Sequence, residues 1–161
     1  MKTLRTLSDL TDASLVPHDP KFLELTDRYT VAISSNMQRE LNSSGITRQF
    51  VPSLSELTVQ QDELEDPIGD EAYTPVKGVT HRYEDRVLLK ASHRCAVYCR
   101  FCFRREKVGD DGDDLLDEDF TTALDYIRQH TELWEVILTG GDPLFLPLNR
   151  LQKILDELSQ I

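Results

Sequence analysis

The strongest constraint on the fold is an order of elements that repeats in the second half of the chain. Segment 86–91 is short and mostly apolar, as in a buried strand, and a helical pattern follows it at 117–131. The same order returns with a strand at 134–139 and a helix at 148–158. Such βα repetition builds parallel sheets or barrels with helices outside, and its functional loops lie at the carboxyl ends of the strands. We therefore predict an α/β fold.

The first part of the chain is predicted to be helical. A helix is expected to start at residues 19–20, where an N-cap precedes a proline, and its apolar spacing continues as far as Ile33. A second helix should run through Met37 and Leu41, until residues 42–45 end it.

Residues 46–80 are richer in proline, glycine and acidic residues, which indicates an irregular connection with one short helix after Ser53. We place the domain boundary within this segment. Residues 1–65 are then a helical N-terminal region, and residues 66–161 a βα domain.

Composition excludes several classes of protein. The net charge of −11 argues against a nucleic-acid binder, which needs a basic face to neutralise phosphate. No run approaches the roughly 18 apolar residues that a membrane span needs. The N-terminus shows no secretory signal, so we expect a soluble protein in the reducing cytoplasm.

All three cysteines lie within eight residues, in a C-x3-C-x2-C pattern formed by Cys95, Cys99 and Cys102. An odd and tightly clustered set is a poor disulfide framework. Three thiolates on one loop can ligate three irons of a [4Fe–4S] cluster, and the fourth iron stays open to a small chelating molecule. Zinc is the alternative, but it usually needs four ligands, and the fourth would have to be His93, His81 or a distant residue. His93 is the best candidate, although its spacing to Cys95 is cramped. Thiols without a metal also remain open from the spacing alone.

A glycine-rich motif, residues 139–143, follows the second predicted strand. Gly140 and Gly141 allow the backbone to approach a ligand closely, and Asp142 with strand-end carbonyls can hold an ammonium group. A tight turn is the other interpretation, because Gly-Asp-Pro is common turn chemistry.

Two groups of arginines lie near the cysteines. Arg82 and Arg86 flank Tyr83 before the first strand, while Arg104 and Arg105 follow the last cysteine. Their guanidinium groups suit phosphate or carboxylate, although surface arginines often make only solvated ion pairs.

Together these motifs resemble the radical S-adenosylmethionine (SAM) superfamily and, more narrowly, the lysine 2,3-aminomutase family. Phe101 supplies the aromatic residue of the C-x3-C-x-aromatic-C signature. The likeness covers about residues 66–150, with blocks at 78–88, 98–105 and 138–143 in the expected order.

The resemblance implies an isomerase that performs a radical 1,2-amino shift on lysine or a similar amino acid by way of a 5′-deoxyadenosyl radical. It implies a partial (β/α)6 barrel after the helical region, with a [4Fe–4S] cluster, SAM and pyridoxal 5′-phosphate (PLP) as cofactors. By position in the motifs, the implied roles are cluster ligation by Cys95, Cys99 and Cys102, SAM binding by Phe101, Gly140, Gly141 and Asp142, PLP binding by Arg82, Tyr83 and Arg86, and pairing with the substrate carboxylate by Arg104.

The likeness does not extend to the whole family. Its members are much longer, and the lysine that forms their PLP Schiff base lies in their C-terminal part. Lys77, Lys90 and Lys107 do not match that position, so no catalytic residue is assigned. We expect an N-terminal fragment that is inactive as an aminomutase by itself, and a homo-oligomer would be a feature of the full-length form.

Two alternatives remain. A relative of the family acts on a lysine residue of elongation factor P, although the sequence at 105–109 and the longer helical N-terminus favour a free amino acid. A zinc- or cluster-binding module without turnover is the alternative from another class. The acidic run 110–114 does not fit the ligand spacing of an EF-hand, and we expect it to be a solvated loop.

Overall fold

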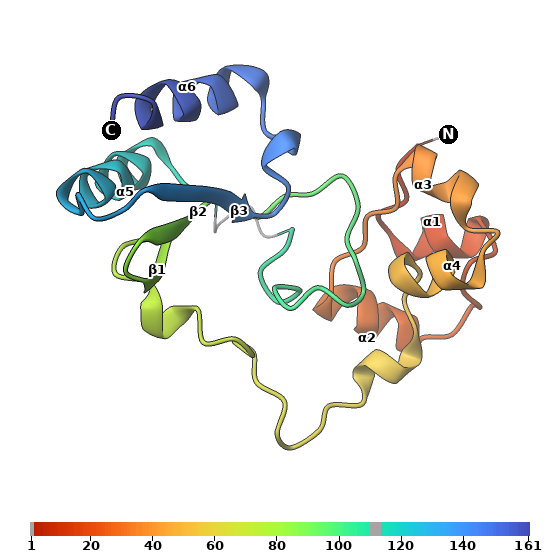
Figure 1. Ribbon diagram of the computed structural model, residues 1–161. Coiled ribbons are helices and arrows are strands. Elements are labelled where there is room, and N and C mark those ends of the chain that lie inside the picture. Colours follow the sequence, from red (N-terminus) through yellow and green to blue (C-terminus); the bar gives the residue numbers. More distant parts are fainter. Residues whose placement is uncertain (1, 110–113) are drawn as a thin grey trace. The chain divides into compact units, whose positions relative to one another are not determined.

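The computed structural model describes residues 2–109 and 114–161 (Figure 1), so most of the acidic run lies outside the described residues. The chain forms two compact units that are not continuous in sequence. The first holds Met1–Pro67 and Ala96–Val108, and the second holds Ile68–Cys95 and Gly109–Ile161. The domain bounds 1–65 and 66–161 stay a prediction.

The first unit is helical. Its elements are α1 (Leu7–Asp12), α2 (Lys21–Arg28), α3 (Ser35–Glu40), α4 (Ser44–Phe50) and the 3₁₀ helix η1 (Leu54–Leu57). A capping box opens η1, because the Glu56 carboxylate accepts a hydrogen bond from the Ser53 backbone N–H at 2.8 Å. The short helix predicted after Ser53 is therefore confirmed.

Two helix boundaries of this unit differ from the prediction. Helix α2 ends at Arg28, and Ile33 instead pairs with Leu4 in an isolated β-bridge. The run from Tyr29 to Ile33 is rich in β-branched residues, which favour extended backbone. Residues 42–45 do not simply end a helix either, because α4 begins at Ser44. Serine serves both as a helix stop and as a helix start.

The second unit contains the βα repeat. Its elements are the 3₁₀ helix η2 (Glu71–Tyr73), β1 (Val79–Tyr83), β2 (Arg86–Ser92), α5 (Asp117–Gln129), β3 (Glu135–Gly140), the 3₁₀ helix η4 (Pro143–Phe145) and α6 (Leu148–Leu158). Both predicted strands and both predicted helices are confirmed, with bounds that shift by at most two residues.

The sheet has the order β1-β2-β3 and is mixed. Strands β2 and β3 run parallel, from the pair Arg86–Glu135 to the pair Ser92–Gly140. Strand β1 pairs antiparallel with β2 in a hairpin that was not predicted. The α/β class is confirmed, whereas the partial barrel stays a prediction.

The core of this unit forms where helices α5 and α6 pack on the sheet. Phe120, Leu124 and Ile127 lie on the buried face of α5, as the periodicity predicted, and α6 adds the fully buried Ile154. They pack with apolar side chains of β1 and β2. This packing fixes β2 beside β3, so that both parallel strands end at one edge of the sheet.

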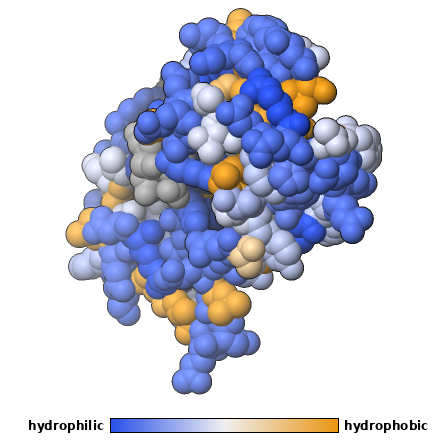
Figure 2. Space-filling view, turned by 90° about the vertical axis from the view of Figure 1, so that its left-hand side faces the viewer, coloured by the Kyte–Doolittle hydropathy of each residue, from blue (hydrophilic) through white to orange (hydrophobic). Residues whose placement is uncertain are grey.

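The surface agrees with the acidic composition. Figure 2 shows a face that is mostly hydrophilic, with hydrophobic residues in separate patches. Among the helices that the structure describes, none has the length and apolar composition needed to span a bilayer.

Candidate functional site

The cysteine loop and the glycine-rich motif begin at neighbouring strand ends. Residues 92–94 leave β2 and lead directly into Cys95, and Gly140 ends β3. Ser92 and Gly140 are paired in the parallel ladder. The two motifs that the sequence singled out therefore emerge at the carboxyl edge of the same sheet, where βα folds place their ligands.

Backbone hydrogen bonds join the two segments. The Gly141 N–H donates to the Ser92 carbonyl at 2.5 Å, and the Asp142 N–H donates to the Arg94 carbonyl at 2.9 Å. Gly140 has a φ of +101°, and a Cβ there would overlap the Ser92 carbonyl oxygen. A Cβ at Gly141 would overlap the backbone of Arg94. Both glycines are thus required by a close backbone contact.

Asp142 also shapes the turn. Its carboxylate accepts a hydrogen bond from the Leu144 N–H at 3.0 Å and caps η4, with Pro143 at the first helical position. The tight-turn interpretation of the motif is therefore confirmed. The SAM-binding roles of the motif stay a prediction.

The three cysteines are half-buried thiols, and none of them forms a disulfide. Cys95 belongs to the second unit, and Cys99 and Cys102 belong to the first. Within residues 2–109 and 114–161, no three side chains of His, Cys, Asp or Glu stand together as a ready metal site. Cluster ligation by these cysteines therefore stays a prediction.

Cys99 and Cys102 are nonetheless suited to ligating a metal. The Cys102 N–H donates to the Cys99 carbonyl at 3.2 Å, which folds this part of the loop into a turn. Burial raises the pKa of the Cys99 thiol, and the nearby Cys102 raises it further. The sulfur of Cys102 is thus close enough to act electrostatically on that of Cys99. Soft sulfur donors in one turn fit an iron–sulfur cluster and also fit zinc.

Arg100, between these cysteines, anchors the loop to the helical unit. Its guanidinium pairs with Glu56 at 2.6 Å, and the two side chains are only 7% and 11% exposed. The backbone N–H of Arg100 donates to the Gln49 carbonyl at 2.7 Å, and the backbone N–H of Tyr98 donates to the Ala32 carbonyl at 2.9 Å. The sequence analysis did not find this anchor, because an ion pair between residues 44 positions apart leaves no local pattern.

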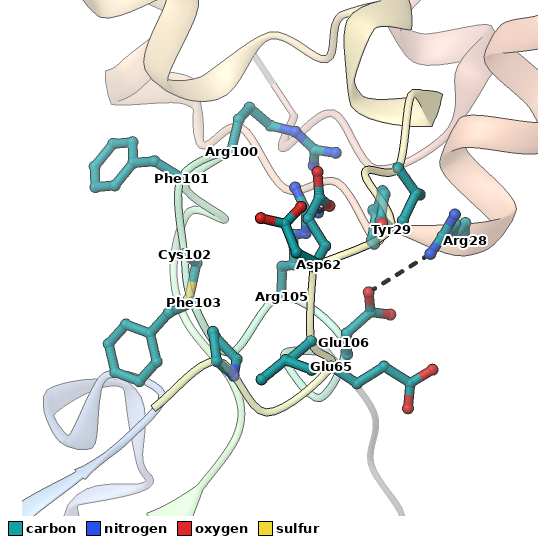
Figure 3. Close-up of a pocket in the computed structure, with 14 residues that line it drawn as sticks. Arg28, Tyr29, Asp62, Glu65, Arg100, Phe101, Cys102, Phe103, Arg105 and Glu106 are labelled. Carbon is teal, nitrogen blue, oxygen red and sulfur yellow. Dashed lines mark ion pairs between the residues drawn. The ribbon is translucent and has the colours of Figure 1, made fainter. Parts of the chain in front are cut away.

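A pocket of about 390 Å³ lies in the first unit (Figure 3), lined in part by Tyr29, Cys102 and Arg105. Phe101 and Phe103 point away from Tyr29, on the other side of the loop. The Phe101 ring is 68% exposed, which leaves its face accessible for stacking. Its place beside the SAM adenine stays a prediction.

The two arginines after the cysteines differ in their surroundings. Arg104 lies over the Phe103 ring, 4.4 Å from its centroid. Arg105 lies over the Tyr29 ring at the same distance and pairs with Glu63 at 3.7 Å. Arg105 therefore has a structural role, and pairing of Arg104 with a substrate carboxylate stays a prediction.

Arg86 is held by carboxylates. It donates two hydrogen bonds to Asp85, both at 2.9 Å, and it also pairs with Glu135 at 3.6 Å. These bonds from Arg86, together with a hydrogen bond from Trp134, hold the pKa of Asp85 well below its usual range. Arg86 begins β2, so it lies at the edge of the sheet opposite to Gly140.

The other two residues predicted to bind PLP are more accessible. Arg82 stacks on the Tyr73 ring at 4.7 Å and donates a hydrogen bond to the Ile68 carbonyl. Tyr83 is 62% exposed, and together with Arg82 and His81 it lines a surface depression. Arginine and tyrosine side chains can each donate a hydrogen bond to a phosphate group. Arg86 fits this role less well, because its charge is already balanced.

A cysteine loop after one parallel strand and a Gly-Gly-Asp turn after the next are the arrangement expected of a radical SAM protein. No protein-family model matches the chain. It is 41% identical over 123 residues to the L-lysine 2,3-aminomutase of Methanococcus maripaludis, a match that covers 76% of this chain and 28% of that protein. The chain belongs to the lysine 2,3-aminomutase family.

Two further relatives widen the comparison. The L-lysine 2,3-aminomutase of Bacillus subtilis is 32% identical over 165 residues, which cover 99% of this chain and 35% of that protein. The glutamate 2,3-aminomutase of Clostridioides difficile is 37% identical over 111 residues, which cover 69% of this chain and 26% of that protein. The chain thus spans between 26% and 35% of the length of these three curated relatives.

Proposed function

We propose that this chain forms the cluster- and SAM-binding part of a radical 2,3-aminomutase that acts on an amino acid. The observation that carries the proposal is the backbone contact of Gly141 and Asp142 with residues 92–94. Because residue 94 precedes Cys95, this contact brings the proposed SAM-binding turn to the base of the proposed cluster loop.

Each residue then has a defined task. Cys95, Cys99 and Cys102 hold the cluster, and the turn at Gly140–Asp142 receives the amino group of SAM. Once reduced by an external one-electron donor, a bound cluster would supply the electron that cleaves SAM into methionine and a 5′-deoxyadenosyl radical, the hydrogen-abstracting group of this chemistry. Phe101 offers its exposed ring to the adenine.

We further propose residues that bind PLP and the substrate. Arg82 and Tyr83 would hold the PLP phosphate, and Arg104 would orient the substrate through its carboxylate. PLP, where bound, would supply aldehyde chemistry for the amino group of the substrate. By their names, two relatives act on lysine and on glutamate. We therefore propose an α-amino acid as the substrate and specify no particular side chain.

The test is anaerobic reconstitution of the full chain with iron and sulfide, followed by EPR spectroscopy of the reduced protein with and without SAM. The proposal predicts a [4Fe–4S]⁺ signal that changes when SAM is added. Folded protein that binds zinc and gives no cluster signal would leave only a structural metal module.

A matched pair of variants assigns the signal to the motif. Cys99→Ser should abolish the cluster. The double variant Cys99→Ser/Ser159→Cys restores the number of thiols to three but places one on the exposed Ser159, after α6. If this double variant assembled the cluster as well as the unmodified chain, the motif would not be the ligand set.

A further inference from the structure

A carboxylate outside both motifs holds the segment that connects them. Asp114 lies after the cysteine loop and before α5, and it binds three consecutive residues of segment 92–94. Its Oδ1 accepts hydrogen bonds from Ser92 Oγ at 2.9 Å and from the His93 N–H at 3.0 Å. Its Oδ2 pairs with Arg94 Nε at 2.9 Å.

Each carbonyl group of segment 92–94 accepts a hydrogen bond from a different residue. The three carbonyl oxygens accept backbone hydrogen bonds from Gly141, Gly109 and Asp142, in that order. The bond from Gly109 to His93, at 3.0 Å, closes the base of the loop that carries the cysteines. One short segment therefore fixes the start of the loop, its end and the glycine-rich turn.

Two of the three residues that Asp114 holds are buried. Ser92 is 4% exposed and His93 is 6% exposed. Buried polar groups need hydrogen-bond partners, and removing an acceptor at such a place costs more than the bond itself contributed. Loss of the Asp114 carboxylate should therefore loosen the segment and, through it, the turn that the carboxylate does not touch.

We propose that Asp114 is a positioning residue of the SAM- and cluster-binding site, and this inference rests on the function proposed above. It acts through segment 92–94, which sets the backbone of Cys95 and the placement of Gly141 and Asp142. The expected consequence of losing it is weaker SAM binding without any loss of a direct ligand.

The first experiment needs no cofactor. Amide hydrogen exchange is measured by NMR at Gly141 and Asp142 in the metal-free chain. In Asp114→Ala these amides should exchange about tenfold faster, because they open more often when their acceptors move. The matched control is Asp119→Ala. Asp119 lies on α5, and its carboxylate pairs with Lys77 at 2.9 Å. Exchange as slow in Asp114→Ala as in the unmodified chain would overturn the proposal.

The second experiment titrates SAM into the reconstituted proteins and follows the EPR signal. Asp114→Ala should bind SAM about tenfold more weakly, a change of ~1.4 kcal/mol. Asp114→Asn should lose less, because its amide oxygen still accepts from Ser92 and His93. Asp119→Ala should bind as the unmodified chain does. Equal affinity in Asp114→Ala and Asp119→Ala would show that Asp114 positions nothing.

The two experiments separate the inference from the proposed function. If the unmodified chain gives no SAM-dependent signal, the proposed function fails, while amide exchange still decides whether Asp114 holds the turn. If Asp114→Ala does not fold, Asp114→Asn replaces it in both measurements, because its amide NH₂ group cannot pair with the Arg94 guanidinium. Exchange and SAM affinity in Asp114→Asn should then change in the same direction by a smaller factor, and values equal to those of Asp119→Ala would overturn the inference.

Discussion

At the scale of single residues, Gly141 gives the sharpest prediction. A methyl group there would overlap the backbone of Arg94, which cannot move without disturbing β2. Overpacking of this kind costs about 1–3 kcal/mol, so Gly141→Ala should lower the free energy of unfolding by about 2 kcal/mol and weaken the SAM response. Urea denaturation measures the first effect.

Gly45→Ala is the matched control. A Cβ at Gly45, in α4, would lie 3.8 Å from Ser43 Oγ, an ordinary contact. Alanine is favoured over glycine in helices by about 0.5–1 kcal/mol, so this variant should be as stable as the unmodified chain or more so. Equal stability of the two variants would mean that the contact between Gly141 and Arg94 is not tight.

The lowered pKa of Asp85 predicts that the stability of the fold depends on pH. Its pKa is lowered in the folded chain, chiefly by Arg86, so its contribution is present above the unfolded-state pKa of about 3.9 and is lost as the pH falls toward the folded value. Asp85→Asn should therefore be less stable at pH 7, and the difference should shrink below pH ~4. Urea denaturation followed by circular dichroism at each pH measures the difference, because Trp134 donates its indole N–H to Asp85 and its fluorescence would change with the substitution itself. A difference constant from pH 7 to pH 3 would contradict this.

Single residues were predictable where local spacing carries the signal. The Gly-Gly pair at a strand end predicted a close approach of the backbone to a ligand, and in the structure the closely approached group is the backbone of segment 92–94. The engagement of Arg86 by Asp85 could have been suspected from their adjacency, but the contribution of Glu135 depends on strand pairing. Asp114 lies in an acidic run that looked like a solvated loop, and nothing in the spacing indicates that it reaches segment 92–94.

At the scale of elements, helix α6 is attached through one fully buried side chain, that of Ile154. Ile154→Ala should lower the free energy of unfolding by about 3 kcal/mol, because the site loses apolar contacts and keeps a cavity. Leu155→Ala, at a position that is 47% exposed, should cost under about 1 kcal/mol. Thermal unfolding followed by circular dichroism measures both variants. Equal losses would mean that α6 is not docked through Ile154.

The part of the cysteine loop in the first unit depends on the buried pair between Arg100 and Glu56. Arg100→Met leaves a buried carboxylate without its cation and should cost about 3 kcal/mol. Adding Glu56→Met should recover part of that loss, because it removes the unpaired charge but also the capping bond to Ser53. Arg128→Met is the control, since its pairs on the surface should contribute under about 1 kcal/mol. A double-mutant cycle in urea with no coupling between the two residues would contradict this role for the pair.

Elements with strong periodicity were predicted well, and those shaped by tertiary pairing were not. The regular apolar spacing in α5 and α6 marked their positions directly. Strand β1 was missed because His81 and Arg82 lie within it, and an antiparallel edge strand with polar side chains gives a weak pattern. Helix α2 was predicted too long because the apolar spacing continued into a segment that is extended.

At the scale of the whole molecule, metal should contribute to stability. The proposed cluster, bound by three thiolates, would favour the folded state by mass action, because the unfolded chain does not hold the site together. Reconstituted protein should therefore melt several degrees higher than the metal-free chain, and an iron chelator should reverse the gain. Equal melting temperatures, despite bound iron, would mean that the cluster sits on a part of the chain that does not limit unfolding.

The contact between the glycine-rich turn and segment 92–94 has a consequence for protein engineering. It is made by N–H and carbonyl groups of the main chain, so its specificity resides in the path of two backbone segments and not in side-chain chemistry. Grafting only the cysteines, or only the side chains of the turn, onto another scaffold would not transfer this backbone contact. The arrangement is portable only as a pair of strand ends with their register intact.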